Sequence, residues 1–126
     1  RPGVPDLSER IRVRSAVDRL LEHTRVVRFE HGGRPEFWIG SADWMPRNLR
    51  GRVEVLCRIR SDSIAQRLEE ILDVYRDDDV KARQLEADGN YQRVATVNGV
   101  RAQEWLIQRA LAMAGATLVQ ARPERE

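Results

Sequence analysis

His23 and Arg25, in the run EHTR, are the first side chains in this sequence that could do chemistry. In an extended segment, residues two apart point to the same side, so the imidazole and the guanidinium could contact one phosphate group together. The alternative is that a histidine at the end of a helix only caps it or interacts with its dipole. His31, by contrast, stands at a turn and is expected to be solvent-exposed.

A second group of polar residues lies in the run IGSADWMPRN, which follows a short β-rich segment. Gly40 permits close approach of the backbone, and Ser41 offers a hydroxyl and an amide. Asp43 can accept a hydrogen bond from an imidazole N–H and so fix the tautomer of the ring. The order of these residues is typical of a turn that handles an anion.

Three further donors follow: Arg47 and Asn48 in the same run, and Arg52 at the start of the next β-rich segment. Their spacing would let them close round a polyanion. Ordinary surface charge on a loop is the alternative explanation. The sequence therefore predicts an anion site built from several weak motifs.

Arginine supplies almost all of the positive charge, because Lys81 is the only lysine among 22 basic residues. Residues 1–60 carry 13 arginines against 8 acidic residues, whereas residues 61–126 carry 9 basic and 12 acidic residues. The planar arginine fork suits phosphate oxygens, so a basic first half is consistent with a phosphate-bearing partner. Genome base composition explains most of these arginines equally well, so only those beside motifs carry functional weight.

Length and composition limit the class of protein. A chain of 126 residues and 14.6 kDa is expected to form one domain with a modest core. The opening RPGVPDLSER has no initiator methionine and no signal-peptide pattern, so we expect the sequence to begin within a protein. No apolar run reaches the roughly 18 residues of a membrane span. Cys57 is the only cysteine and is expected to be buried. A single cysteine excludes disulfides within the chain and cysteine-based metal sites, and it is consistent with a protein of the reducing cytoplasm.

The pattern of apolar residues predicts the elements that position these side chains. Val13, Val17, Leu20 and Leu21 recur at a helical period, which predicts a helix from about Ser8 to Glu22 or His23. TRVVRF and EFWIGS are separated by Gly32 and Gly33, which predicts a hairpin, and GRVEVLCRI predicts a third strand beside it.

In the second half, Ile64, Leu68, Ile71, Leu72 and Tyr75 predict a helix from Ser61 to about Arg76. The run DDDVKAR predicts a short second helix start, and EADGNYQRVATVNG a loop. A final helix in VRAQEWLIQRALAMAG is expected to end at Gly115 and to face inward with Val100, Trp105, Leu106, Ala110 and Met113. ARPERE is expected to be a frayed tail. The order indicates an α/β layered fold.

Several runs together are more specific than any one motif: LEHTRVVRF, HGG, IGSADWMPRN, RVEV, ILD, VKAR, and the later Y-x-R and R-x-Q-E. In this combination the sequence resembles the C-terminal part of the long-chain polyphosphate kinases, from PGVP to the last helix. That region in turn resembles half of a phospholipase D type site, whose pattern is H-x-K followed by G-S-x-N. Here the pattern stands as His23-Thr24-Arg25 and Gly40-Ser41-Ala42-Asp43.

The resemblance implies a phospholipase D-like α/β half-domain, with a mixed β-sheet flanked by helices, in which residues 1–126 are the C-terminal catalytic domain of a larger kinase. Such kinases transfer the terminal phosphate of ATP reversibly to polyphosphate through a phosphohistidine in an upstream domain. The implied cofactor is Mg²⁺, with no metal ligand in this chain. We therefore expect the chain alone to be inactive as a kinase.

The resemblance also implies roles for individual residues. His23 matches the second essential histidine of the family, as an acid/base or positioning group, Arg52 matches an arginine at the phosphates, and Glu54 matches an acid that could orient an imidazole. With the motifs above, the expected catalytic residues are His23, Asp43 and Glu54. The expected ATP- and phosphate-binding residues are His23, Arg25, Ser41, Arg47, Asn48 and Arg52.

Two departures from the phospholipase D pattern separate the possible functions. Arg25 stands for its lysine and Asp43 for its asparagine, and the kinases share these departures, which favours a kinase over a phosphodiesterase. The alternatives are a polyphosphate- or nucleic-acid-binding module without catalysis, and a hydrolase half-site completed by a second copy. The kinase function implies ATP, ADP and polyphosphate as ligands, the upstream domains as partners and a homo-oligomer, without nucleic acid or a transmembrane segment. Its location would be cytoplasmic, with peripheral membrane association left open.

Overall fold

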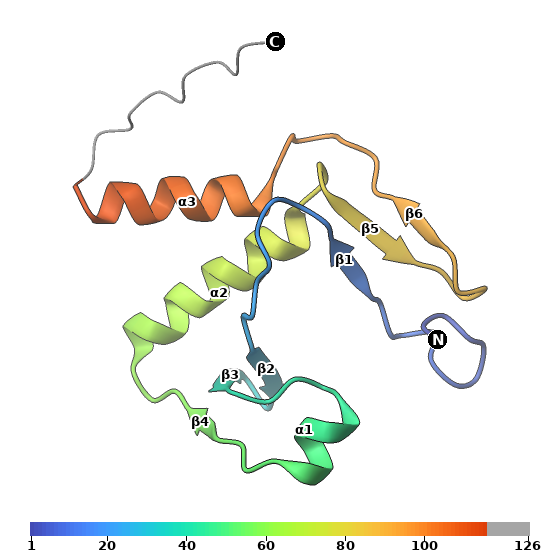
Figure 1. The fold of residues 1–126 in the computed structure, drawn as a ribbon, viewed down its shortest axis with the longest axis horizontal. Helices are drawn as coiled ribbons and strands as arrows, with labels where there is room; N and C mark the ends of the chain where they lie inside the picture. The colour runs from blue at the N-terminus through green and yellow to red at the C-terminus, as the bar shows by residue number, and fades with distance from the viewer. Residues whose placement is uncertain (116–126) are drawn as a thin grey trace. The chain divides into compact units, whose positions relative to one another are not determined.

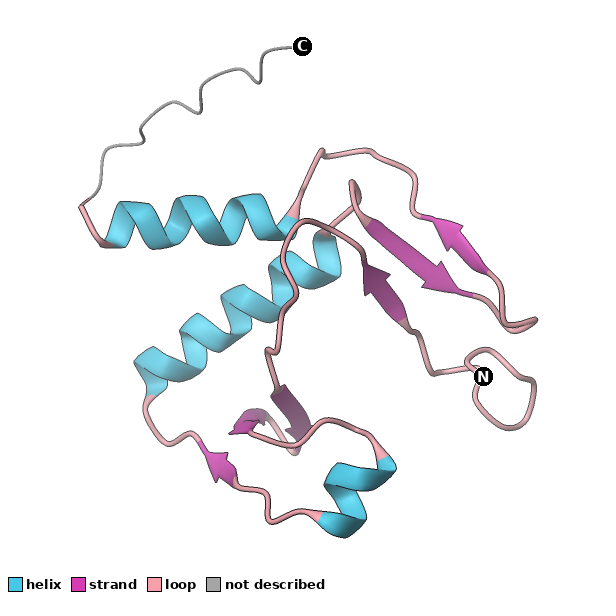
Figure 2. Cartoon of the chain, in the orientation of Figure 1, coloured by secondary structure: helices cyan, strands magenta, loops and turns pink. Residues whose placement is uncertain are grey.

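The computed structural model describes residues 1–115, which fall into two compact units (Figure 1). One contains residues 1–18 and the chain from residue 77 onward, and the other contains residues 19–76. Both units combine helices with strands (Figure 2), which confirms the predicted α/β class. The strands form two three-stranded antiparallel sheets instead of the single mixed sheet that the sequence predicts. The tail expected at residues 121–126 lies outside the described residues.

The unit of residues 19–76 is built on the sheet β2–β3–β4, with bounds β2 Val26–His31, β3 Arg34–Gly40 and β4 Leu56–Arg58. The predicted hairpin is confirmed: His31 pairs with Arg34, and the two residues between them, Gly32 and Gly33, have φ of 60° and 109°. Such a two-residue turn needs positive φ at both positions, which glycine adopts without steric cost. The predicted third strand is also confirmed, but only its last residues pair.

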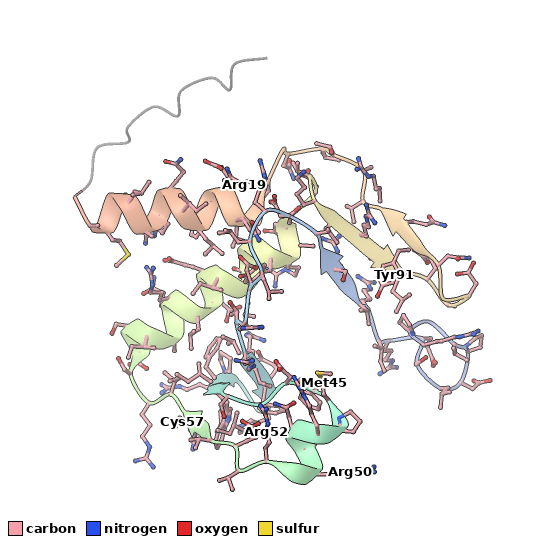
Figure 3. All side chains as sticks on the ribbon, in the orientation of Figure 1. Arg19, Met45, Arg50, Arg52, Cys57 and Tyr91 are labelled. Atoms are coloured by element: carbon pink, nitrogen blue, oxygen red, sulfur yellow. The ribbon has the colours of Figure 1, made fainter. Side chains whose placement is uncertain are left out.

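Between β3 and β4 lies a short helix that the sequence analysis does not predict, α1 Pro46–Gly51. Proline suits this first helical position because its φ is already helical and the amide it lacks would be unpaired there. The prediction that Cys57 is buried is wrong, since the cysteine is exposed on β4 (Figure 3). Within the run VEVLCRI only residues 56–58 form a strand, and all three are exposed, so the expectation of a strand buried on at least one face is wrong.

The predicted helix of residues 61–76 is confirmed as α2 Asp62–Asp77. It buries Leu68 and Val74, while Phe37 of β3 is only 3% exposed, so these residues form the small core of this unit. Arg28 of β2 donates to Glu69 of α2 at 2.8 Å. This ion pair joins α2 to the hairpin that carries the predicted site.

The other unit contains the sheet β1–β5–β6, with bounds β1 Arg14–Ala16, β5 Ala82–Leu85 and β6 Tyr91–Arg93. The prediction of a helix from Ser8 to His23 is wrong, because residues 14–16 pair with β5 and the rest of this segment is irregular. Every second residue in this segment alternates with a polar or small one: Ile11, Val13, Ser15 and Val17. This period of two predicts a strand as well as the helical spacing predicts a helix.

The prediction of a helix start in DDDVKAR is also wrong. Asp78 is 1% exposed, and its Oδ1 accepts hydrogen bonds from the amides of Val80, Lys81 and Ala82 at 2.7–3.1 Å. The carboxylate therefore caps the backbone as it enters β5. The segment EADGNYQRVATVNG, predicted as a loop, contains β6 and a turn in which Gly89 has φ of 96°.

The final helix is confirmed as α3 Ala102–Met113, and Gly115, with φ of 68°, follows its end as predicted. Its predicted inward face is wrong at three of five residues: Trp105 is 39% and Met113 62% exposed, and Ala110 is exposed, whereas Val100 and Leu106 are half-buried. The first helical residue, Ala102, is fully buried instead. Arg101, just before it, makes a two-pronged ion pair with Asp18, whose side chain is 2% exposed.

Asp79 gives this unit a defined response to acid. Its carboxylate accepts hydrogen bonds from the amides of Val97, Asn98, Gly99 and Val100, and these bonds hold its pKa below the usual value. A lowered folded-state pKa means that the stabilisation is complete above the unfolded pKa of about 3.9 and is lost as pH falls through the folded pKa.

We therefore expect Asp79→Asn to lower stability at neutral pH and to reduce the loss of stability on acidification. Urea unfolding of both chains at several pH values below 6 would measure this. Parallel stability curves for the two chains over the acid range would contradict the role assigned to Asp79.

Candidate functional site

The predicted site lies where β2 begins and β3 ends. The amide of Gly40 donates to the carbonyl of Arg25 at 3.1 Å, and the amide of Ser41 donates to the carbonyl of Val55 at 3.1 Å. These two bonds continue the strand pairing past the sheet and hold the start of β2 and the segments on either side of α1 together. The structure therefore brings the EHTR and GSAD motifs to one place, as the sequence predicts.

Arg25 and Asp43 form an ion pair at the centre of this place. The Nε of Arg25 donates to Oδ1 of Asp43 at 2.8 Å, and its Nη1 donates to the backbone carbonyl of His23 at 3.3 Å. The guanidinium holds the pKa of Asp43 below its usual value, and the nearby charges of His23 and Arg47 lower it further. Asp43 is thus ionised at neutral pH and fixes the plane of the Arg25 guanidinium.

Glu54 forms a second cluster beside this pair. Ser41 Oγ donates to its Oε2 at 2.5 Å, and Asn48 Nδ2 donates to its Oε1 at 3.0 Å. Ser41 Oγ also accepts from the amide of Val55 at 3.1 Å. The bond from Ser41, then the bond from Asn48 and the charges of Arg52 and Arg25, lower the pKa of Glu54. The carboxylate joins the GSAD turn to α1.

Asn48 has a packing role that the sequence analysis does not predict. It is 3% exposed and is the buried residue of α1, whereas the sequence suggests only a donor on a loop. Its Oδ1 is buried without a hydrogen-bond partner among the described residues. The sequence signal for this role is weak: Asn48 stands two residues after Pro46, which suits the start of a helix.

The remaining predicted residues, His23, Arg47 and Arg52, are exposed beside these two clusters. Figure 3 shows Arg52 directly after α1, with Arg50 on the helix itself. The positive charges of Arg47 and Arg52 lower the pKa values of Asp43 and Glu54 respectively, so both guanidinium groups lie near the carboxylates. Three arginines and two carboxylates leave a net positive charge of about one, before any charge on His23.

Asp43 and Glu54 were expected to orient an imidazole. In the structure both carboxylates accept hydrogen bonds from other side chains instead. Asp43 accepts from Arg25, and Glu54 accepts from Ser41 and Asn48. Sequence spacing identified the members of the site correctly as neighbours. Sequence spacing could not assign the hydrogen bonds, because the arginine and the imidazole of the segment before β2 compete for one carboxylate.

A cavity of about 440 Å³ opens beside the ion pair. Its polar lining includes Thr24, Arg25, Asp43 and Glu54, and the rest of its lining is mostly apolar, including Val27, Phe29, Trp44, Leu49, Val55 and Leu56. Trp44 is 85% exposed, so its indole covers little of the cavity. Arg25 and the hydroxyl of Thr24 are the side-chain donors that this lining offers to an anionic ligand, beside the two carboxylates.

Among the described residues, no group of three or more histidine, cysteine, aspartate or glutamate side chains could hold a metal ion. Asp43 and Glu54 are the acids of the site, and each already accepts hydrogen bonds from neighbouring side chains. The two acids of this site therefore do not fit a magnesium site.

Gly40 is required at the point where these strands meet. A Cβ at this position would lie 2.9 Å from the backbone carbonyl oxygen of Val55 and 2.9 Å from Cδ1 of Leu56. We expect Gly40→Ala to cost about 1–3 kcal/mol, since the backbone must shift to admit the methyl group. Gly51→Ala is the matched control, because a Cβ there meets nothing within 4 Å. Urea unfolding of the two variants measures the difference, and equal stability would contradict the close approach at Gly40.

The fold and the site define an α/β domain in which a basic cluster at strand ends can receive an anion. Residues 1–104 match the family model described as polyphosphate kinase C-terminal domain 2, so the chain belongs to that family. The resemblance inferred from the sequence is thereby confirmed.

Similar proteins agree with this assignment. The chain is 51% identical over 94 residues to a polyphosphate kinase from Rhodopirellula baltica, an alignment that covers 75% of this chain and 11% of that protein. It is 48% identical over 96 residues to one from Streptomyces coelicolor, covering 76% and 13%. The crystal structure of polyphosphate kinase from Porphyromonas gingivalis superposes with a TM-score of 0.79 at 34% identity, covering 90% of this chain and 18% of that one. The matched region thus spans only 11% and 13% of the length of these two curated relatives.

Among residues 1–115, no helix combines the length and the apolar composition that crossing a membrane requires.

Proposed function

We propose that residues 1–126 are the C-terminal catalytic domain of a polyphosphate kinase and supply one side of the site that transfers phosphate between ATP and polyphosphate. The observation that carries this proposal is the convergence of Arg25, Arg47, Arg52 and His23 around the ends of β2 and β3. Phosphoryl transfer needs alignment and neutralisation of charge more than covalent chemistry from each side chain. A cluster of arginines with a histidine beside it meets that need.

In this proposal Asp43 and Glu54 are positioning residues. Asp43 holds the guanidinium of Arg25 by its Nε and the carbonyl of His23 accepts from its Nη1, which leaves Nη2 to face phosphate oxygens. Glu54 locks Ser41 and Asn48, and so fixes the GSAD turn against α1. Arg52 and Arg47 neutralise the phosphates, and Ser41 and Asn48 shape the anion site.

His23 has the chemical role. As a neutral imidazole it can accept a proton, and as an imidazolium it can donate one to a phosphate oxygen or contact it directly. The phosphohistidine that the resemblance implies belongs to another domain of such kinases. A bond from that histidine to phosphorus would form as the bond from phosphorus to the departing ADP oxygen breaks. On this proposal the 126-residue chain alone is inactive and acts with upstream domains.

Mg²⁺ would neutralise charge on the phosphates of the nucleotide in such a kinase. The acids of this site are committed to other partners, so we assign no magnesium ligand to it and no step through the metal. We also propose a cytoplasmic location and a homo-oligomeric assembly, which rest on the family resemblance.

Arginine substitutions test this function. In the kinase that carries this domain, Arg52→Ala is expected to lower the rate of labelled γ-phosphate transfer from ATP into acid-insoluble polymer by about 10²–10³, since it removes a charge aimed at the transferring phosphates. Arg50→Ala is the matched control: this arginine is two residues away, on the last turn of α1, and is expected to leave the rate unchanged. Equal losses for Arg50→Ala and Arg52→Ala would contradict a specific phosphate contact.

A polyanion-binding module without catalysis is the second candidate, favoured by the exposure of Arg47 and Arg52. Such a module would bind polyphosphate with an affinity that falls steeply with salt and that survives the loss of His23. Polymer synthesis that depends on His23 would exclude it.

A further inference from the structure

A second cavity, of about 670 Å³, lies in the same unit as the proposed site but at the opposite end of the β2–β3 hairpin. It is formed by the turn between β2 and β3, the end of β4 and the start of α2. Figure 1 labels these four elements. Its charged lining residues are His31, Arg34, Glu36, Arg58, Arg60 and Asp62. The two cavities have no lining residue in common, although they adjoin along the hairpin, where Phe29 of the first cavity pairs with Glu36 of the second.

Two side chains of this cavity are already held in place by Glu36. Its Oε1 accepts from Nε2 of His31 at 3.0 Å and from a terminal nitrogen of Arg58. The hydrogen bond from His31, and then the charge of Arg58, lower the pKa of Glu36, so the carboxylate is ionised at neutral pH. Glu36 therefore positions Arg58 at the rim of the cavity in the same way that Asp43 positions Arg25.

Arg34 and Arg60 complete the positive lining. Neither has an ion pair or a hydrogen bond from its side chain within residues 1–115, so both guanidinium groups are available to a ligand. Three arginines against Glu36 and Asp62 leave a net charge of about plus one. The lining also includes Phe37, which is 3% exposed.

We propose that this cavity is a second phosphate-binding site, separate from the reaction site, which takes several consecutive units of a condensed phosphate chain. Guanidinium groups bind phosphate oxygens through paired N–H donors, and arginines on two separate segments, the hairpin and the end of β4, can engage more than one phosphate unit. The volume lies within the range of ligand pockets, and a single orthophosphate would fill only part of it. The choice of a condensed phosphate chain rests on the proposed function, whereas the presence of an anion site does not.

Binding to the full 126-residue chain tests this site with sodium tripolyphosphate as the probe. In an ¹⁵N-labelled sample, tripolyphosphate is expected to shift the amide signals of Ser61 and Ala65 in a saturable manner. The double variant Arg34→Ala/Arg60→Ala should weaken this response at least about tenfold, since two charged hydrogen-bonding groups are lost. Both side chains are exposed, and unchanged circular dichroism would verify that the variant is folded.

The matched control is Arg83→Ala/Arg93→Ala, which removes the same charge from exposed positions of β5 and β6. This control is expected to leave the response of Ser61 and Ala65 intact. Equal weakening by the two double variants, or tripolyphosphate shifts confined to amides near Asp43, would overturn the proposal. If the alanine variant does not fold, the more conservative pair Arg34→Gln/Arg60→Gln removes the same two charges, and the same loss of binding is expected.

Two comparison ligands identify the source of the phosphate. Tripolyphosphate is expected to bind this cavity more tightly than orthophosphate and more tightly than ATP, because the nucleoside finds no dedicated contact here. Equal affinity for orthophosphate would overturn the assignment to a phosphate chain. Failure of the proposed kinase function would give a different result: phosphate transfer from ATP would not depend on His23. The binding of tripolyphosphate measured at Ser61 would then be unchanged.

Discussion

Replacing His23 with alanine is expected to lower the transfer of labelled γ-phosphate from ATP into polyphosphate by about 10²–10⁴ in the kinase that carries this domain. His23 is exposed beside the Arg25–Asp43 pair, and its charge contributes to the lowered pKa of Asp43. On the proposed function, an imidazole at this position would exchange a proton with a phosphate oxygen bound by Arg25. Its loss should therefore affect the chemical step more than the binding of ATP.

A second substitution separates the two roles proposed for His23. Glutamine keeps a hydrogen-bonding group near the position of the imidazole but cannot transfer a proton at neutral pH. If His23→Gln is as slow as His23→Ala, the imidazole acts as an acid or base; if His23→Gln recovers most of the rate, His23 positions the phosphates. Gln92→Ala, an exposed change on β6, is the control and should be neutral. A rate for His23→Ala equal to that of the unchanged enzyme, with folding intact, would remove His23 from the mechanism.

The site was more predictable from the sequence than the fold around it. His23, Arg25, Ser41 and Asp43 were predicted to be neighbours because two short motifs stood at the ends of two strands joined by a Gly-Gly turn. Strand pairing is local in a hairpin, so the register follows from the turn. The resemblance added Glu54 and gave a role to Arg52, which spacing alone did not distinguish from surface charge.

The hydrogen-bond partners within the site were not predictable. Asp43 had two basic neighbours within reach, and the choice of Arg25 depends on side-chain geometry that spacing does not contain. The burial of Asn48 depends on the helix that Pro46 starts, and a proline between two polar segments indicates a loop as readily as a helix start. Tertiary contacts, not local sequence, decided both cases.

The wrong predictions have a common physical origin. The segment from Ser8 to His23 has apolar residues at a helical period. However, Val17, Leu20 and Leu21 are all exposed, so burial of these side chains does not stabilise a helix there. On α3, Trp105 and Met113 are likewise exposed within the described chain. Periodicity predicts an apolar face, whereas the element and its orientation depend on what that face packs against.

Asp78 shows how one side chain can decide a local structure against its sequence pattern. The run DDDV favours a helix start, since acids stabilise the positive end of a helix dipole. Instead, Oδ1 of Asp78 accepts from three successive amides, and its Oδ2 accepts from the amide of Ala102 at 2.8 Å. The same carboxylate therefore starts β5 and caps the first turn of α3, two elements that are distant in sequence.

Asp78→Ala is expected to destabilise this unit by at least about 3 kcal/mol, because it leaves several buried amides without an acceptor and each unsatisfied group costs about 1–3 kcal/mol. That is a large share of the total stability of a small domain. Asp78→Asn should cost less: its amide oxygen can keep the bonds to Val80, Lys81 and Ala82, while its NH₂ group faces the amide of Ala102. The loss for Asp78→Asn is expected to be about 1–3 kcal/mol.

Hydrogen exchange at the amides of Ala82 and Ala102, together with urea unfolding, measures both effects. In Asp78→Asn the protection of Ala102 should fall while that of Ala82 remains, whereas in Asp78→Ala both should fall. Asp77→Ala is the matched control, since Asp77 is exposed and its loss should cost about 1 kcal/mol at most. If Asp78→Ala is no less stable than Asp77→Ala, the buried carboxylate does not join β5 to α3, and the position of the loop before α3 must have another cause.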